Sequence, residues 1–113
     1  MIIVKDDSVH FKVFSPAIMT MLNCLYSLNL QQIPEFPSDF IITSANDSTS
    51  HSAKSKHYIN KALDLRSKNF TTKIAKLNFM VKMKMMLGDD FTILLESENK
   101  PNEHFHIQVK KGL

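Results

Sequence analysis

The chain has 113 residues, a length that accommodates one domain with a hydrophobic core but not two. Its 43% hydrophobic and 22% charged residues are ordinary values for a folded protein and exclude a wholly disordered chain. A formal net charge of +3 suits contact with anionic polymers but is too small to indicate a nucleic-acid-binding protein. The single cysteine, Cys24, has no partner for an internal disulfide, so it implies no oxidising compartment. We therefore expect one domain over residues 1–113.

Neither a signal peptide nor a membrane span is expected. An acidic residue, Asp6, comes too early for the apolar region of a signal peptide. The longest apolar stretch, within residues 17–30, is interrupted by polar side chains. We expect a protein made in the cytoplasm of its cell or of a host cell, which acts at a cell wall after release or as part of a virus particle.

The first part of the chain predicts a strand and then a helix. Apolar residues at every second position over residues 9–13 are typical of a half-buried strand. Ser15 and Pro16 are typical of a helix start, and the helix is expected over residues 16–31, before Pro34. Its apolar stripe consists of Ile18, Leu22, Leu25 and Leu28.

A polar segment occupies the middle of the chain. Residues 44–56 have hardly an apolar side chain and predict a long surface loop, a kind of segment that is often functional. The loop follows a predicted buried strand at residues 39–43 and precedes a predicted strand at residues 62–66.

A second helix is predicted after this strand. Asn69 or Thr71 is a suitable cap, and the helix is expected to run to Leu87 and stop at Gly88. The apolar residues at helical spacing, which we expect to face the core, are Phe70, Ile74, Leu77, Val81 and Met85.

Two further strands, residues 91–96 and 104–110, end the chain. The order strand, helix, strand, strand, helix, strand, strand predicts an α+β fold. We expect an antiparallel sheet with the two helices packed on one face and a functional site on the other.

The last predicted strand carries two histidines on one face. His104 and His106 point to one side of the strand, while Phe105 and Ile107 point to the other. Exposed histidines on strands are common, so the pair alone does not identify a metal site. Glu103 precedes the strand, where a loop can turn its carboxylate toward the same site.

A second group of polar residues lies between the long loop and the next strand. His57 follows the loop, and Asp64 stands between Leu63 and Leu65 in an otherwise apolar strand. A carboxylate in such a setting requires a cation or several hydrogen bonds. Contact with Arg66 or a lysine at a sheet edge meets this requirement, and so does a bound metal ion.

Together the two groups supply the parts of a catalytic zinc site. Catalytic zinc takes three protein ligands and leaves one position for water, and histidine nitrogen and aspartate oxygen both suit the ion. A nearby glutamate that is not a ligand can accept the proton of that water. The candidates are His57, Asp64 and His106 as ligands and Glu103 as the base.

The two groups resemble the motifs of the zinc D-Ala-D-Ala metallopeptidases, which share their fold with the amino-terminal domain of hedgehog proteins. The family patterns are Ser-x-His-x-x-Gly-x-Ala-x-Asp and Glu-x-Trp-His. The resemblance extends more loosely over residues 41–107, and the small size is similar to that of bacteriophage members. The matching residues are Ser55, His57, Ala62, Asp64, Glu103, His106 and, in place of tryptophan, Phe105.

The resemblance implies a peptidase with bound zinc as its cofactor. Its substrate would be an amide bond in peptidoglycan stem peptides, cleaved as a D-Ala carboxypeptidase or as a cross-link endopeptidase. By this resemblance His57, Asp64 and His106 bind zinc, and Glu103 is the general base.

The chain departs from the family at two places. Asn60 replaces a glycine, and asparagine is the residue most tolerant of positive φ after glycine. The arginine that larger members place before the first ligand has no counterpart in residues 44–50, and His51, Lys54 or Lys56 can take its place. Contacts to substrate or support for the ligands are expected from Ser55, His51, His104 and Arg66.

Two other functions stay open. A virus particle or tail component can keep the fold and the zinc site without turnover, with other virion proteins as partners. A nucleic-acid binder would use the lysines of the second helix, but no array of stacking aromatic residues accompanies them. We therefore expect no nucleic-acid partner. These lysines are Lys73, Lys76, Lys82 and Lys84.

Overall fold

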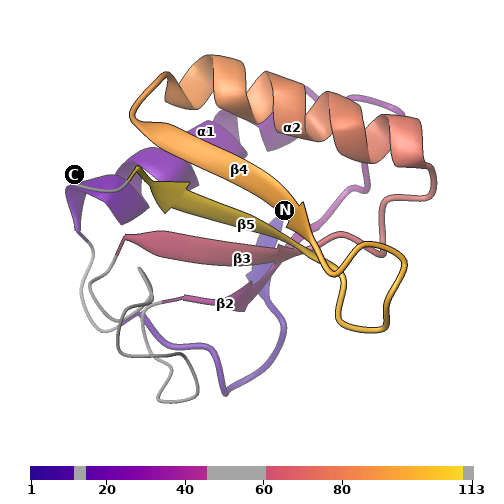
Figure 1. Cartoon of the computed structure of the whole chain (residues 1–113), viewed down its shortest axis with the longest axis horizontal. Coiled ribbons are helices and arrows are strands. Elements are labelled where there is room, and N and C mark those ends of the chain that lie inside the picture. Colours follow the sequence, from indigo (N-terminus) through magenta and orange to yellow (C-terminus); the bar gives the residue numbers. More distant parts are fainter. Residues whose placement is uncertain (12–14, 46–60, 111–113) are drawn as a thin grey trace.

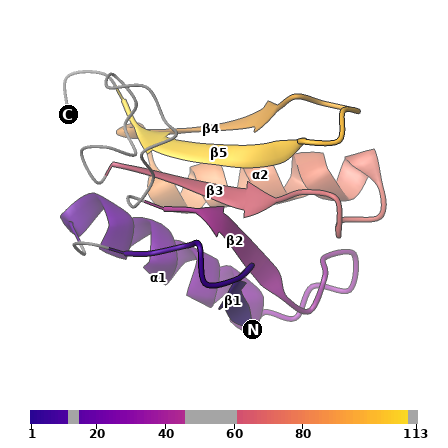
Figure 2. The same ribbon diagram turned by 90° about the horizontal axis from the view of Figure 1, so that it is seen from below.

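The structure, a computed structural model, describes residues 1–11, 15–45 and 61–110. Both helices lie on one side of a five-stranded sheet (Figures 1 and 2). This α+β arrangement, with the helices on one face, is the predicted one. The described elements are β1 (Ile2–Val4), α1 (Pro16–Leu30), β2 (Phe40–Ser44), β3 (Ala62–Arg66), α2 (Lys73–Leu87), β4 (Phe91–Glu96) and β5 (His104–Val109).

The sheet has the strand order β1-β2-β3-β5-β4 and is mixed. The pairs β2–β3, β3–β5 and β4–β5 are antiparallel, but β1 runs parallel to β2. The expectation of a wholly antiparallel sheet is therefore wrong at this edge. The chain passes through α1 between β1 and β2, and such a crossover allows the two strands to run in the same direction.

The first strand also lies at a different place from the predicted one. It comprises Ile2–Val4, whereas Val9 to Phe11 form no strand and residues 12–14 lie outside the described part of the chain. Val9 is buried and Phe11 packs against the core. The alternating pattern thus indicated burial of side chains, which this segment achieves outside a β-strand.

The first helix agrees with its sequence pattern. The Ser15 side chain accepts a hydrogen bond from the backbone N–H of Ile18, so Ser15 caps the helix as predicted. Three predicted core positions, Ile18, Leu25 and Leu28, are buried, and Leu22 packs against the core.

The second helix does not agree with its sequence pattern. Its cap is Thr72, which accepts a hydrogen bond from the N–H of Ala75, rather than Asn69 or Thr71. The predicted stripe is wrong, because four of its members are exposed on the outer side of α2: Ile74, Leu77, Val81 and Met85. The residues that α2 buries are Ala75, Phe79, Met83 and Leu87.

An aromatic cluster explains which side of α2 is buried. Phe79 lies against Phe105 of β5 with ring centroids 4.7 Å apart, and Phe70 meets both rings edge-on at 5.0 and 5.1 Å. Phe36 and Phe40 extend the cluster toward β2. Such ring pairs add about 0.5–1.5 kcal/mol each to the free energy of area burial. The cluster therefore fixes α2 against β5, the strand that carries the predicted histidines.

Candidate functional site

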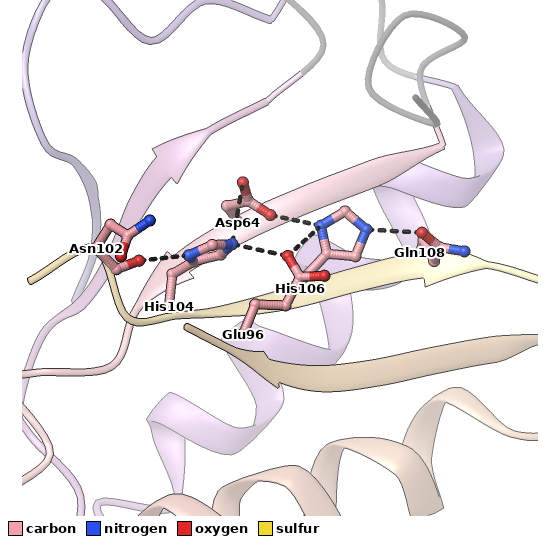
Figure 3. A network of polar contacts seen from close by, with 6 residues as sticks. All are labelled: Asp64, Glu96, Asn102, His104, His106 and Gln108. Atoms are coloured by element: carbon pink, nitrogen blue, oxygen red, sulfur yellow. Dashed lines mark hydrogen bonds and ion pairs between the residues drawn. The ribbon is translucent and has the colours of Figure 1, made fainter. Parts of the chain in front are cut away.

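The strand register gives the sheet two chemically different faces. β5 pairs with both β3 and β4, and directly opposite residues share a face. Most apolar residues of these strands face the helices, whereas Asp64 is opposite His106 and Glu96 is opposite His104 on the other side (Figure 3). Leu94, which is also opposite His106, lies on this other side too. The register thus gathers two carboxylates and two imidazoles on the face away from α1 and α2. We call these four residues the polar cluster.

The central contact of the polar cluster joins β3 to β5. His106 Nδ1 lies 2.7 Å from Asp64 Oδ1, and His106 Nε2 lies 2.7 Å from Gln108 Oε1. Both side chains of the Asp64–His106 pair are only 12% exposed. Burial by itself lowers the pKa of His106, but the hydrogen bond and charge of Asp64, helped by Gln108 and Glu96, raise it above the ordinary value. The contact with Asp64 therefore favours the protonated form of the His106 ring.

His104 connects the remaining members of the polar cluster. Its Nδ1 lies 2.7 Å from the carbonyl oxygen of Asn102, and its Nε2 lies 2.9 Å from Glu96 Oε1. The same Nε2 is 3.9 Å from Asp64 Oδ2, and Glu96 Oε1 is 3.9 Å from His106 Nδ1. Each imidazole of the cluster therefore lies within 4 Å of both carboxylates.

Asp64 and His106 offer donor atoms of the kind that zinc prefers. Two ligand atoms on a tetrahedral zinc lie roughly 3.3 Å apart at normal bond lengths, so the 2.7 Å pair needs only a small separation to admit the ion. Among the residues that the structure describes, no three His, Cys, Asp or Glu side chains form a metal-binding group. Zinc binding here therefore requires a further ligand. The expected one, His57, lies in residues 46–60, outside the described part of the chain.

The other predicted site residues fall in different places. His51 and Ser55 also lie outside the described residues. Arg66 is exposed at the end of β3 and is opposite His104 in the sheet register. The sequence also allowed Arg66 or a lysine as the basic partner of Asp64. In the structure, the partners described for Asp64 are the two histidines of β5. The structure thus brings together Asp64, His104 and His106, with Arg66 beside them in the register.

Glu103 has a separate set of partners. Its Oε1 accepts hydrogen bonds from Ser67 Oγ and Lys76 Nζ, both at 2.6 Å, and its Oε2 accepts one from the N–H of Asn99 at 2.9 Å. The side chain is only 3% exposed. Burial by itself raises the pKa of this carboxyl, but the three donors and the charge of Lys76 lower it to about 2. Glu103 therefore anchors the start of β5 to α2.

The expected orientation of Glu103 is wrong. The turn before β5 directs its carboxylate toward Lys76 of α2, and the structure does not bring it together with the Asp64–His106 pair. The physical reason is that Lys76 and Ser67 compensate the charge at a position that is otherwise buried. The role of Glu103 as a general base stays a prediction, and it requires the carboxylate to leave Lys76.

Sequence reasoning missed Glu96 as a member of the polar cluster. In β4, Thr92, Leu94 and Glu96 alternate with residues that face the helices, so the strand pattern contains the signal. What was missing is the pairing of β4 with β5, which sets Glu96 opposite His104. The assumption that the last two predicted strands form a β-hairpin would have placed Glu96 near His104.

Comparison with known proteins adds no family assignment. No family model and no curated protein matches this chain. No helix in the described part of the chain is both long and apolar enough to cross a membrane.

Proposed function

We propose that this chain is a zinc-dependent peptidase that hydrolyses an amide bond in peptidoglycan stem peptides, as a bacteriophage-type D-Ala carboxypeptidase or cross-link endopeptidase. The observation that carries the proposal is the 2.7 Å contact between Asp64 and His106 on the sheet face away from the helices. These two residues come from the two separate motifs that resemble the zinc peptidase patterns. Their meeting in one pair is what a shared ligand set requires.

In this proposal Asp64 and His106 hold zinc together with His57. Bound zinc would supply a Lewis acid that activates water for attack on the amide carbonyl. Gln108 lies 2.7 Å from the second nitrogen of His106 and thereby orients the ring, as outer partners of metal-binding histidines commonly do. His104 lies beside the pair and is available to contact the substrate.

The general base has two candidate carboxylates. Glu103 matches the family motif but is held by Lys76, Ser67 and Asn99. Glu96 lies on the same side as the ligands, with Oε1 3.9 Å from His106 Nδ1. A base must lie within reach of the proton that it accepts. This geometric criterion favours Glu96 for the proton-accepting role.

Zinc content tests the proposal most directly. Protein purified without chelators is expected to carry about one zinc per chain, the number that one mononuclear site holds. His106→Ala should remove stoichiometric zinc from elemental analysis, whereas His10→Ala, a histidine outside both motifs, should not. Absence of zinc from the wild type, even after zinc is added, would contradict the proposal.

A structural component of a virus particle is the second candidate. The engagement of Glu103 by Lys76 favours it, because it leaves the family's base unavailable. Such a protein would bind zinc at the same site but release no D-alanine and cleave no cross-linked muropeptide from several wall types. It would also occur in stoichiometric copies in particles, which quantitative mass spectrometry of purified particles measures.

A further inference from the structure

A row of large apolar side chains lies on the outer side of α2. Ile74 is 68% exposed, Leu77 43%, Val81 58% and Met85 79%. Intervals of three and four residues place them on one side of the helix, over about 16 Å of its length. We call these four residues the outer stripe. Because α2 buries its opposite side against the core, the outer stripe is a second apolar side of the same helix.

A helix that is apolar on two sides normally has both sides covered. Contiguous exposed apolar side chains are a mark of interaction sites. On α1 the exposed large apolar residues are more widely spaced, at Met19, Tyr26 and Leu30. The outer stripe is thus a continuous row of exposed apolar side chains rather than scattered exposure.

The charges along the outer stripe indicate the chemistry of a partner. The helix α2 has four lysines and no acidic residue. Carboxylates reach it near its N-terminal end and on one flank, where Lys73 pairs with Glu98 and the Asn78 amide binds Glu35. In the C-terminal half, the described residues that Lys84 Nζ binds are Gly88 and Phe91, through their carbonyl oxygens.

Lys82 completes the positive border of the C-terminal half. It is exposed, follows Val81 directly and forms no ion pair with another residue that the structure describes. Lys82 and Lys84 lie on opposite flanks of the outer stripe, since they project about 160° apart around the helix axis. The apolar row is therefore bordered by positive charge on both flanks near its C-terminal end.

We propose that the outer stripe docks an amphipathic helix of a partner protein, whose apolar face is bordered by acidic residues opposite Lys82 and Lys84. Helix-in-groove and helix-on-helix docking use apolar anchors at this spacing. A second copy of this chain with the two α2 helices parallel fits less well, because it would set Lys82 and Lys84 against the same lysines across the contact. The proposal goes beyond the peptidase function and does not depend on the zinc site.

Two synthetic helical peptides test the proposal on the full chain. Both carry leucines at positions i, i+3, i+7 and i+11, one with glutamates and the other with lysines beside the apolar face. Backbone amide resonances of α2 should shift saturably with the glutamate peptide in NMR titrations. Substitution of Leu77→Glu with Val81→Glu should raise the half-saturating concentration at least tenfold, as loss of central anchors does.

Matched controls separate docking from damage to the fold. Leu94→Glu changes an apolar residue of β4 that is also half-exposed, and it should leave peptide binding unchanged. Lys82→Glu should weaken the glutamate peptide severalfold and strengthen the lysine peptide, because the border charge is reversed. A destabilised protein would not invert this preference.

Several results would overturn the proposal. Failure of the glutamate peptide to bind, or equal binding of both peptides, would remove the acidic helix as the occupant. A dimer in analytical ultracentrifugation that Leu77→Glu with Val81→Glu dissociates would assign the outer stripe to a second copy. Binding to anionic phosphatidylglycerol vesicles that depends on the same two residues, without peptide binding, would assign it to a membrane surface.

Discussion

The two sides of β5 hold charged groups in opposite ways. On the helix side, both carboxylate oxygens of Glu103 accept hydrogen bonds from protein donors, among them Lys76 at 2.6 Å. On the other side, Asp64 and Glu96 are engaged by the imidazoles of His104 and His106. Histidine is a group that can exchange a proton or a carboxylate contact for a metal ion. One strand therefore carries a permanent anchor on one side and exchangeable contacts on the other.

The comparison teaches that a motif position does not determine a role. Glu103 and His106 are three residues apart and belong to one motif, yet they face different surroundings. A buried carboxylate with an ammonium partner contributes to stability, and it costs much when the partner is removed. A carboxylate next to imidazoles can contribute to chemistry. Substitutions on the two sides of β5 should therefore affect different measurements.

The largest expected difference is in hydrolysis. Glu96→Gln should lower turnover of a cross-linked muropeptide on the order of 10²-fold or more, as removal of a positioned base does. Glu103→Gln should leave turnover nearly unchanged. The comparison is made per folded molecule and at matched zinc content. The assay is release of D-alanine or of cleaved muropeptide under conditions where circular dichroism shows both variants folded. The opposite ranking would return the role of the base to Glu103.

Loss of the contact between Lys76 and Glu103 should lower the stability of the fold. Lys76→Met leaves Glu103 buried without its ammonium partner and should lower the free energy of unfolding by about 3 kcal/mol or more. Adding Glu103→Gln to Lys76→Met should recover part of the loss, because the unpaired charge is removed. Urea unfolding measures the two single variants, Lys76→Met and Glu103→Gln, and the double variant. Additive losses in the double variant would show that the two residues do not act as a pair.

Acid should weaken the same anchor. The pKa of Glu103 is lowered from 4.5 in the unfolded chain to about 2 in the folded one, so its stabilisation is complete above pH 4.5 and is lost as the pH falls toward 2. The shift corresponds to about 3 kcal/mol at most. Glu103→Gln should flatten the fall of unfolding free energy in this pH range. A wild-type and variant difference that is constant from pH 6 to pH 2 would contradict this linkage.

Much of the fold follows from the sequence alone. The start of α1 at Ser15 and Pro16 and the bounds of β3 were predictable, because caps and strand alternation are local signals. The outer side of α2 was not, because Ile74 and Phe79 are equally apolar and only the aromatic cluster around Phe79 decides which of them is buried. Which side of a helix is buried depends on the residues that pack against it, and not on the sequence of the helix alone.

The candidate site was predictable in part. Strand alternation correctly set His104 and His106 on the face opposite Phe105, and the motif spacing selected Asp64. The same alternation assigns Glu103 to the side of Phe105, and only the motif resemblance argued otherwise. Glu96 could not be added without the register of β4 on β5, which depends on a long-range pairing.

The smallest expected effect comes from a second pair of opposite charges on α2. Lys73 pairs with Glu98, and their side chains are 62% and 36% exposed, compared with 17% and 3% for Lys76 and Glu103. Both pairs tie α2 to the loop between β4 and β5, so they differ mainly in burial. Exposed pairs contribute little because water screens them and ordering two long side chains costs entropy.

Glu98→Gln should therefore change the free energy of unfolding by less than about 0.5 kcal/mol in urea titrations at moderate salt. Raising the salt concentration should reduce even this difference, whereas the effect of Lys76→Met should persist because burial protects that pair from screening. The outcome that would break the comparison is an equal loss in Glu98→Gln and Glu103→Gln. It would mean that burial does not set how strongly these two contacts hold the loop before β5.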